Sequence, residues 1–153
     1  MTTTSSERGL TLRSPGRFLA AAERLADLYR GLGDGADPAL RDRVVRAWMD
    51  AQAYRLHTFQ TVARMLSGQP IGAESSLTKI FWSEMDIRIH EAAMDLLGEA
   101  AAMEFGAAEA PDGGRWTKGY QFALAGTIDA GTNEIQRNLV AQRVLGLPRE
   151  KRR

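Results

Sequence analysis

The side chains best suited to chemistry in this chain gather near its end, in the run from Gly131 to Arg149. Gly131 permits a backbone geometry that a Cβ atom would penalise. A side-chain oxygen of Thr132 or Asn133 can then cap the start of a helix, with Glu134 in its first turn. Because the first N–H groups of a helix have no partner within it, a polar helix start of this kind can hold an anion such as a pyrophosphate.

Other residues that could do chemistry are scattered and lack the spacing of a recognisable site. His57 and His90 stand in helical segments without a second ligand at metal-binding spacing, which favours structural roles. The step from Asp86 to His90 also differs from the Glu-x-x-His pairs of di-iron bundles. Glu84 and Asp86 are expected on a solvated helix face. The chain has no cysteine, which excludes a thiolate site or a disulfide.

Apolar periodicity predicts an all-α fold, an up-down helical bundle of three long and two shorter helices. Ser14-Pro15 and Asp37-Pro38 each place a capping residue and a proline at the start of a long helix. The expected helices span about residues 15–30, 38–67, 73–102, 116–128 and 133–145.

The second long helix carries a heptad-like seam, with residues at alternating three- and four-residue steps. Its members are Val45, Met49, Gln52, Leu56, Phe59, Ala63 and Leu66. This spacing predicts antiparallel packing in the bundle. The closing helix is apolar on two sides and therefore needs two partners, the bundle and a neighbouring subunit or domain. Those sides hold Ile135 with Leu139, and Val140 with Val144 and Leu147.

Composition restricts the class of protein. A chain of 153 residues fits one domain, and 44% hydrophobic residues can bury a core without disulfides or metals. The net charge of +1 argues against nucleic-acid binding. The sequence contains neither an apolar run of membrane-spanning length nor a signal-peptide core, so we expect a cytoplasmic protein. We expect residues 1–6 to be disordered, 7–149 to form the bundle, and 150–153 to be a tail.

The run from Gly131 to Arg149 resembles the C-terminal signature of the acyl-CoA dehydrogenases, which reads Gly-Thr-Asn-Glu-Ile-Gln-Arg, an apolar helix and Leu-Gly-Leu-Pro. Lys79–Glu84 and Ala93–Gly98 are similar to the central helix of many bacterial members, and the resemblance covers about Glu7 to Arg149. It implies that a carboxylate removes the α-proton of an acyl-CoA substrate while a hydride passes to FAD. It further implies reoxidation by an electron-transfer flavoprotein, and two preceding domains that this chain lacks.

The resemblance also points to a catalytic base. In one branch of the family a Glu stands directly before the Gly-Thr pair, where this chain has Ala130, which cannot take a proton. In another branch the Glu belongs to a Glu-Arg pair at the start of the helical domain. Glu7, followed by Arg8, occupies that place and is the candidate base. The alternative is a solvent-exposed Glu7 without a catalytic role.

Cofactor contacts follow from the same resemblance. Gly131, Thr132 and Glu134 match positions that approach the phosphate and ribose region of FAD in the family. Gly98 matches one glycine of a pair near the adenine end, but Glu99 replaces its neighbour. The Arg-x-x-Phe-Gly run that usually reaches a neighbouring subunit's cofactor is missing.

Two functions follow from these observations. The chain is either the C-terminal domain or subunit of an FAD-dependent acyl-CoA dehydrogenase, inactive without the missing domains, or a non-catalytic helical assembly protein without flavin. The Gly131–Glu134 turn favours the first, and Ala130 favours the second. Both imply a homo- or hetero-oligomer with acyl-CoA dehydrogenase-like chains.

Overall fold

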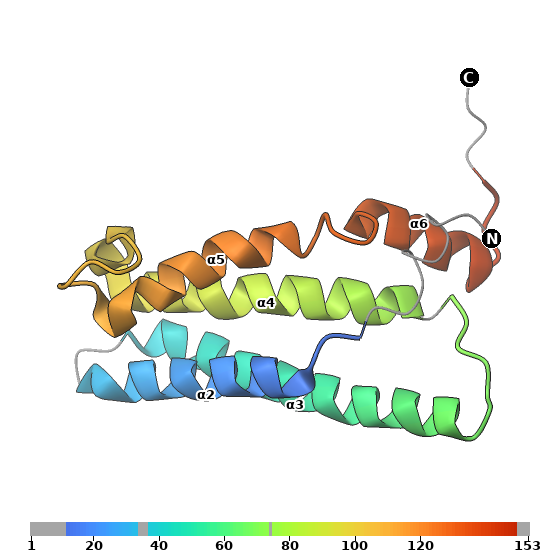
Figure 1. The fold of residues 1–153 in the computed structure, drawn as a ribbon, viewed down its shortest axis with the longest axis horizontal. Helices are drawn as coiled ribbons and strands as arrows, with labels where there is room; N and C mark the ends of the chain where they lie inside the picture. Colours follow the sequence, from blue (N-terminus) through green and yellow to red (C-terminus); the bar gives the residue numbers. More distant parts are fainter. Residues whose placement is uncertain (1–11, 34–36, 74, 150–153) are drawn as a thin grey trace.

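A computed structural model of the chain describes residues 12–33, 37–73 and 75–149, and all regular structure within these ranges is helical (Figure 1). The α-helices are α2 (Pro15–Gly31), α3 (Pro38–Leu66), α4 (Ser75–Leu97), α5 (Arg115–Ala125) and α6 (Asn133–Arg143), with short 3-10 helices η2 (Gly98–Ala102) and η3 (Pro111–Gly114). The predicted all-α fold of three long and two shorter helices is confirmed. None of these described helices is long and apolar enough to cross a membrane.

Helix α4 lies at the centre of the bundle. Figure 1 shows α2 and α3 below it, while α5 and α6 follow each other along its upper side. Contacts place α6 on the N-terminal half of α4, where Asn133 meets Lys79, and α5 on the C-terminal half, where Trp116 meets His90. The position of each functional side chain can therefore be described along α4.

The core joins α2, α3 and α4 through aromatic rings. Phe18 of α2 meets Tyr54 of α3 edge to face at 5.2 Å between ring centroids, and Trp82 of α4 in a stacked arrangement at 6.3 Å. The Tyr54 hydroxyl donates to the carbonyl oxygen of Arg13 at 2.9 Å and accepts from its N–H at 3.1 Å. The Arg13 guanidinium lies 5.1 Å from the centre of the Trp82 ring. The chain entering α2 is thus fixed against α3 and α4.

Several helix ends differ from expectation. The third long helix ends at Leu97 and not near residue 102, because Gly98 takes a left-handed φ of 56° and a 3-10 turn follows. Asp37 caps α3 as predicted, since its Oδ1 accepts from the N–H of Ala39 at 2.8 Å. Ser14 makes no side-chain cap bond, although Pro15 does take the first helical position.

The heptad-like seam of α3 is the largest departure. The residues that α3 buries are mostly small or polar and lie on a different side: Val44, Ala47, Ala51, Tyr54, Thr58 and Thr61. Leu56, Phe59 and Leu66 of the seam remain exposed, at 62%, 59% and 84% of their surface. The prediction that this seam packs within the bundle was wrong, because α2 and α4 approach the side of α3 with smaller side chains.

Candidate functional site

The turn before α6 has an unusual backbone. Ala130 and Gly131 both have positive φ, 55° and 90°. Glycine adopts this geometry freely, whereas Ala130 is strained by about 1–2 kcal/mol. Two hydrogen bonds hold the turn: the Gln136 side-chain nitrogen donates to the Ala130 carbonyl at 3.0 Å, and the Asn133 N–H donates to the Thr127 carbonyl at 2.9 Å. The expected backbone role of Gly131 is confirmed.

Thr132 caps α6, and its Oγ1 accepts from the N–H of Ile135 at 3.4 Å. The pKa of the exposed Glu134 carboxyl is lowered, first by its own backbone N–H and then by the Thr132 hydroxyl. The protein's own oxygens therefore already satisfy donors at the start of α6. An anion at this position competes with the Glu134 carboxylate, which weakens the simple anion site that the sequence predicted.

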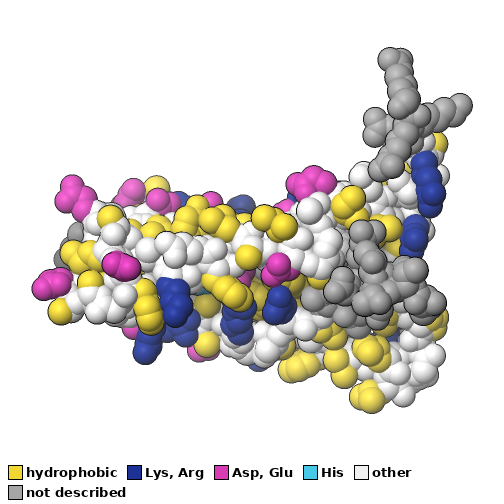
Figure 2. Space-filling model, turned by 45° about the horizontal axis from the view of Figure 1, so that its top comes forward, with side chains coloured by type: hydrophobic (Ala, Val, Ile, Leu, Met, Phe, Trp, Pro, Cys, Tyr) yellow, Lys and Arg dark blue, Asp and Glu magenta, His cyan; other side chains and the backbone are white. Residues whose placement is uncertain are grey.

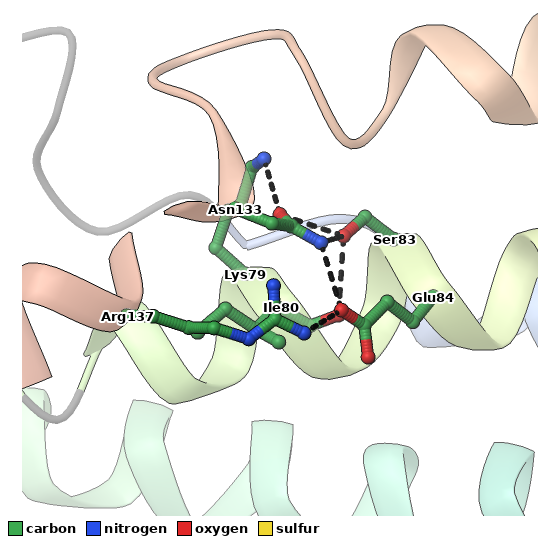
Figure 3. Close-up of polar contacts among 6 residues, drawn as sticks. All are labelled: Lys79, Ile80, Ser83, Glu84, Asn133 and Arg137. Atoms are coloured by element: carbon green, nitrogen blue, oxygen red, sulfur yellow. Dashed lines mark hydrogen bonds and ion pairs between the residues drawn. The ribbon is translucent and has the colours of Figure 1, made fainter. Parts of the chain in front are cut away.

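Asn133 has a different task from the capping role considered for it. Its side chain turns away from its own helix and binds α4, as Figure 3 shows. The Lys79 ammonium donates to Asn133 Oδ1 at 2.7 Å, and Ser83 Oγ lies 3.1 Å from Nδ2 and 3.2 Å from Oδ1. Asn133 Nδ2 also donates to Glu84 Oε1 at 3.1 Å. All polar atoms of this amide face α4, so it sets the position of the turn.

A charge pair completes the contact between the two helices. Arg137, one turn along α6, pairs with the Glu84 carboxylate that Asn133 also contacts (Figure 3). Glu84 is half-buried, so its assignment to a solvated face was wrong. We call Lys79, Ser83, Glu84, Asn133 and Arg137 the α6 clasp. These residues stand in the motifs that resemble the acyl-CoA dehydrogenase signatures, but their spacing does not show that they meet.

Lys79 is the only buried cation of the clasp, with 1% of its surface exposed. Burial lowers the pKa of its ammonium group, and the nearby Asp129, Glu134 and Glu84 oppose this effect by favouring the charged form. Its ammonium group donates to the amide oxygen of Asn133. The clasp therefore depends on a charged group that is held by a neutral acceptor.

The remaining predicted site residues do not join this turn. Gly98 follows the last residue of α4, fifteen positions beyond Ser83, which corresponds to about 22 Å along the helix. Glu7 lies outside the described residues. Arg13, which follows Glu7 in the chain, lies within the described residues. The Tyr54 hydroxyl binds the Arg13 backbone, and the Arg13 guanidinium lies over the Trp82 ring, one helical turn from Lys79.

A second polar cluster lies further along α4. Asp86, which is 2% exposed, accepts from Arg17 Nη2 of α2 at 2.7 Å, so its assignment to a solvated face was wrong. His90 is buried, and its Nδ1 donates to the Asp86 backbone oxygen at 2.8 Å. The ring packs against Trp116 of α5 at 5.7 Å between centroids. The structural role predicted for His90 is confirmed. Within the described ranges, no group of three His, Cys, Asp or Glu residues could hold a metal ion.

Comparison with known proteins covers nearly the whole chain. The family described as acyl-CoA dehydrogenase, C-terminal domain, matches residues 1–145. The chain is 35% identical to acyl-CoA dehydrogenase IpdE1 of Mycobacterium tuberculosis, across 98% of this chain and 38% of the relative. The corresponding values for IpdE1 of Mycolicibacterium smegmatis are 36%, 98% and 36%.

Solved structures show the same fold. The ChsE4-ChsE5 complex from Mycobacterium tuberculosis contains a chain that matches with a TM-score of 0.79 at 23% identity, over 93% of this chain and 38% of that one. A steroid ACAD, Tcur3481-Tcur3483, matches with a TM-score of 0.79 at 24% identity, over 89% of this chain and 35% of that one. The chain thus spans less than two fifths of the length of these relatives.

Proposed function

Because the chain belongs to the acyl-CoA dehydrogenase family through its C-terminal domain, we propose that it forms the cofactor-side part of an FAD-dependent acyl-CoA dehydrogenase and its oligomer interface. The observation that carries this proposal is the α6 clasp. It holds the Gly131, Thr132 and Glu134 turn at a fixed place on α4, as a cofactor contact requires.

The residues fit FAD only in part. The Thr132 hydroxyl and the N–H groups at the start of α6 are the groups that would hold a phosphate, but Glu134 already binds there. Gly98 lies at the opposite end of α4 and cannot meet the same phosphate. We therefore expect this chain to hold FAD only together with the two other domains of the family, whether in the same chain or on a partner. When bound, FAD supplies the hydride acceptor, and an electron-transfer flavoprotein would reoxidise it.

Ala130 has no carboxyl group, so the position that supplies the base in one branch of the family cannot supply it here. Glu7 is the proposed base. Glu7 stands six positions before Arg13, so its reach from that fixed point is at most about 21 Å. Arg13 itself packs on Trp82, close to the clasp.

A flavin measurement tests the proposal. These 153 residues should stay colourless with added FAD when alone, and the visible flavin spectrum should appear in their complex with a partner that carries the other two domains of the family. Thr132→Val should weaken FAD retention at least fivefold in that complex. Thr117→Val in α5, near the C-terminal end of α4, is the matched control and should not change it. In the same complex, Glu7→Gln should abolish turnover of an acyl-CoA without releasing the flavin.

The alternative function is a non-catalytic assembly protein, and Ala130 is the observation that favours it. A complex that forms but stays colourless with excess FAD would support this alternative. Unchanged turnover in Glu7→Gln would remove Glu7 as the base while leaving the cofactor role intact.

A further inference from the structure

Two buried N–H groups beside the start of α2 have no hydrogen-bond partner within the described ranges. They are Nε of Arg13 and the indole Nε1 of Trp82. Trp82 is only 2% exposed, so solvent does not reach its N–H group. Because an unpaired buried donor costs free energy, an acceptor at this place would stabilise the protein. The two donors therefore point to a group that accepts hydrogen bonds.

The surrounding contacts fix both donors in place. The Tyr54 hydroxyl binds the backbone oxygen and N–H of Arg13, whose guanidinium lies 5.1 Å from the centre of the Trp82 ring. Phe18 stacks on that ring at 6.3 Å between centroids. A Cβ atom at Gly126 would lie 3.0 Å from Cζ3 of Trp82, so the chain after α5 leaves little room for the ring to turn. An acceptor therefore has to come to the indole.

The charges around the start of α2 favour an acceptor that is negatively charged. The first turn of α2 holds no acidic residue, and Ser14 makes no side-chain cap bond, so the positive end of the helix dipole is unopposed there. Arg17 pairs with Asp86, whereas Arg13 has no ion pair among the described residues. Figure 2 shows basic side chains along the face of the bundle where α2 and α5 lie. A carboxylate, which only accepts hydrogen bonds, suits these donors.

The chain itself supplies a carboxylate for this place. Among the twelve residues before Arg13, Glu7 is the only acidic one. It stands six positions before Arg13, and a connection of up to about 21 Å is enough to bring its side chain back to Arg13 and Trp82. The α4 carboxylates closest to Trp82 in sequence, Glu84 and Asp86, already pair with other arginines. Glu7 is therefore the acceptor that best fits the two donors.

We propose that Arg13 and Trp82 are positioning residues that hold the Glu7 carboxylate through hydrogen bonds from Arg13 Nε and Trp82 Nε1. This inference rests on the proposed function, in which Glu7 is the base. An ionised carboxylate has about four acceptor sites, so two donors leave lone pairs free to take the α-proton of the substrate. Trp82 lies one helical turn from Lys79, so the base and the α6 clasp share one end of α4.

The indole N–H signals of the 153-residue chain test this contact without flavin. Trp82→Phe identifies the Trp82 signal in a nitrogen–proton NMR spectrum. At pH 7, Glu7→Gln should shift this signal, because a neutral amide replaces a charged acceptor. In wild type the signal should also move as the pH falls to about 4.3 and below, where a glutamate takes up its proton. In Glu7→Gln this movement should be lost.

Trp116 provides the matched control for the NMR measurement. It is another buried tryptophan, 4% exposed, and it lies under the guanidinium of Arg24. Its indole signal should be the same in wild type and in Glu7→Gln at pH 7. A Trp82 signal that is equally unaffected by Glu7→Gln overturns the proposal. That result says nothing against the cofactor role, because no flavin is present in the experiment.

Turnover tests the positioning role in the complex with the other two domains of the family. Trp82→Phe keeps an aromatic ring in the core and removes the N–H group. It should lower kcat about tenfold, the effect of one lost hydrogen bond to a charged group, while the flavin spectrum remains. The acid limb of the pH–rate profile should move to higher pH, because the ionised base has lost a donor. Trp116→Phe is the control and should keep the wild-type profile.

Arg13→Met provides a second variant at a half-buried position, and its side chain can still pack on the Trp82 ring. It removes the other donor and should move the pH–rate profile in the same direction. Circular dichroism checks that both variants are folded. A wild-type profile in Trp82→Phe and Arg13→Met overturns the positioning role. A wild-type complex without a flavin spectrum would instead contradict the proposed function, so the two failures are distinguishable.

Discussion

Two buried polar clusters on α4 hold different parts of the bundle, and they are built differently. In the α6 clasp, Lys79 and Ser83 bind the side-chain amide of Asn133, and each of these polar groups has a hydrogen-bond partner. In the second cluster, Asp86 binds Arg17 but leaves its Oδ1 without a hydrogen bond, 3.3 Å from His90 Nδ1. The first joins α4 to a helix through polar bonds, and the second is enclosed by packed rings.

The two clusters differ in which kind of substitution the helix contact can tolerate, the contact of α4 with α6 (the α6 joint) or that of α4 with α5 (the α5 joint). Helix α6 fully buries only Asn133 and Gln136, while Ile135 is exposed and Leu139 and Val140 are half-buried, so polar contacts contribute much of its attachment. Helix α5 buries Trp116 and Ala123 and approaches His90 closely at Gly119. We therefore expect the α6 joint to fail when a hydrogen bond is lost and the α5 joint to fail when volume is added.

The largest effect is expected at the clasp. Asn133→Ala removes the acceptor of the buried Lys79 ammonium and should destabilise the chain by about 3 kcal/mol, since hydrogen bonds to buried charged groups are among the most valuable. Asn138→Ala, an exposed position on the same helix, is the control and should change stability by less than about 0.5 kcal/mol. Urea unfolding followed by circular dichroism measures both. Similar values for the two variants would show that the clasp adds little stability.

A smaller loss is expected at the α5 joint. A Cβ atom at Gly119 would lie 2.4 Å from His90 Nε2, so Gly119→Ala forces the ring or the helix to move. Overpacking of about 3 kcal/mol exceeds the gain in helix propensity of about 1 kcal/mol, which leaves a loss of about 2 kcal/mol. Gly16→Ala in α2 meets only Ser14 Oγ at 3.7 Å and should not destabilise. A Gly119→Ala chain with wild-type stability would mean that α5 sits farther from His90.

The two clusters also show what the sequence could reveal. Apolar spacing was enough to predict the helices, because each helix needs one buried side whatever its neighbours are. It could not reveal that α3 buries Ala47 and Ala51 while Leu56 stays exposed, since both rows have helical spacing. Lys79 and Asn133 are 54 residues apart, and no local pattern shows that they meet.

The smallest expected effect is a change of stability with pH, which arises from the buried Lys79 of the α6 clasp. Burial lowers the pKa of Lys79 below its ordinary value of about 10.4, so near that pH the unfolded chain binds a proton that the folded chain has lost. Stability should then rise with pH between the folded pKa and about 10.4, by at most about 1.4 kcal/mol per pH unit. Burial raises the pKa of Tyr54, which makes stability fall with pH above about 10, so the two effects oppose each other.

Comparison with Lys79→Met separates these contributions, because both proteins keep Tyr54. The stability difference between wild type and Lys79→Met should shift in favour of wild type as pH rises through the window below about 10.4. Asn138→Ala, which changes no titratable group, should instead follow wild type in parallel at every pH. A difference between wild type and Lys79→Met that stays constant with pH would mean that Lys79 keeps its ordinary pKa. Solvent would then reach its ammonium group, and the clasp would be an exposed contact unlike the enclosed cluster at His90.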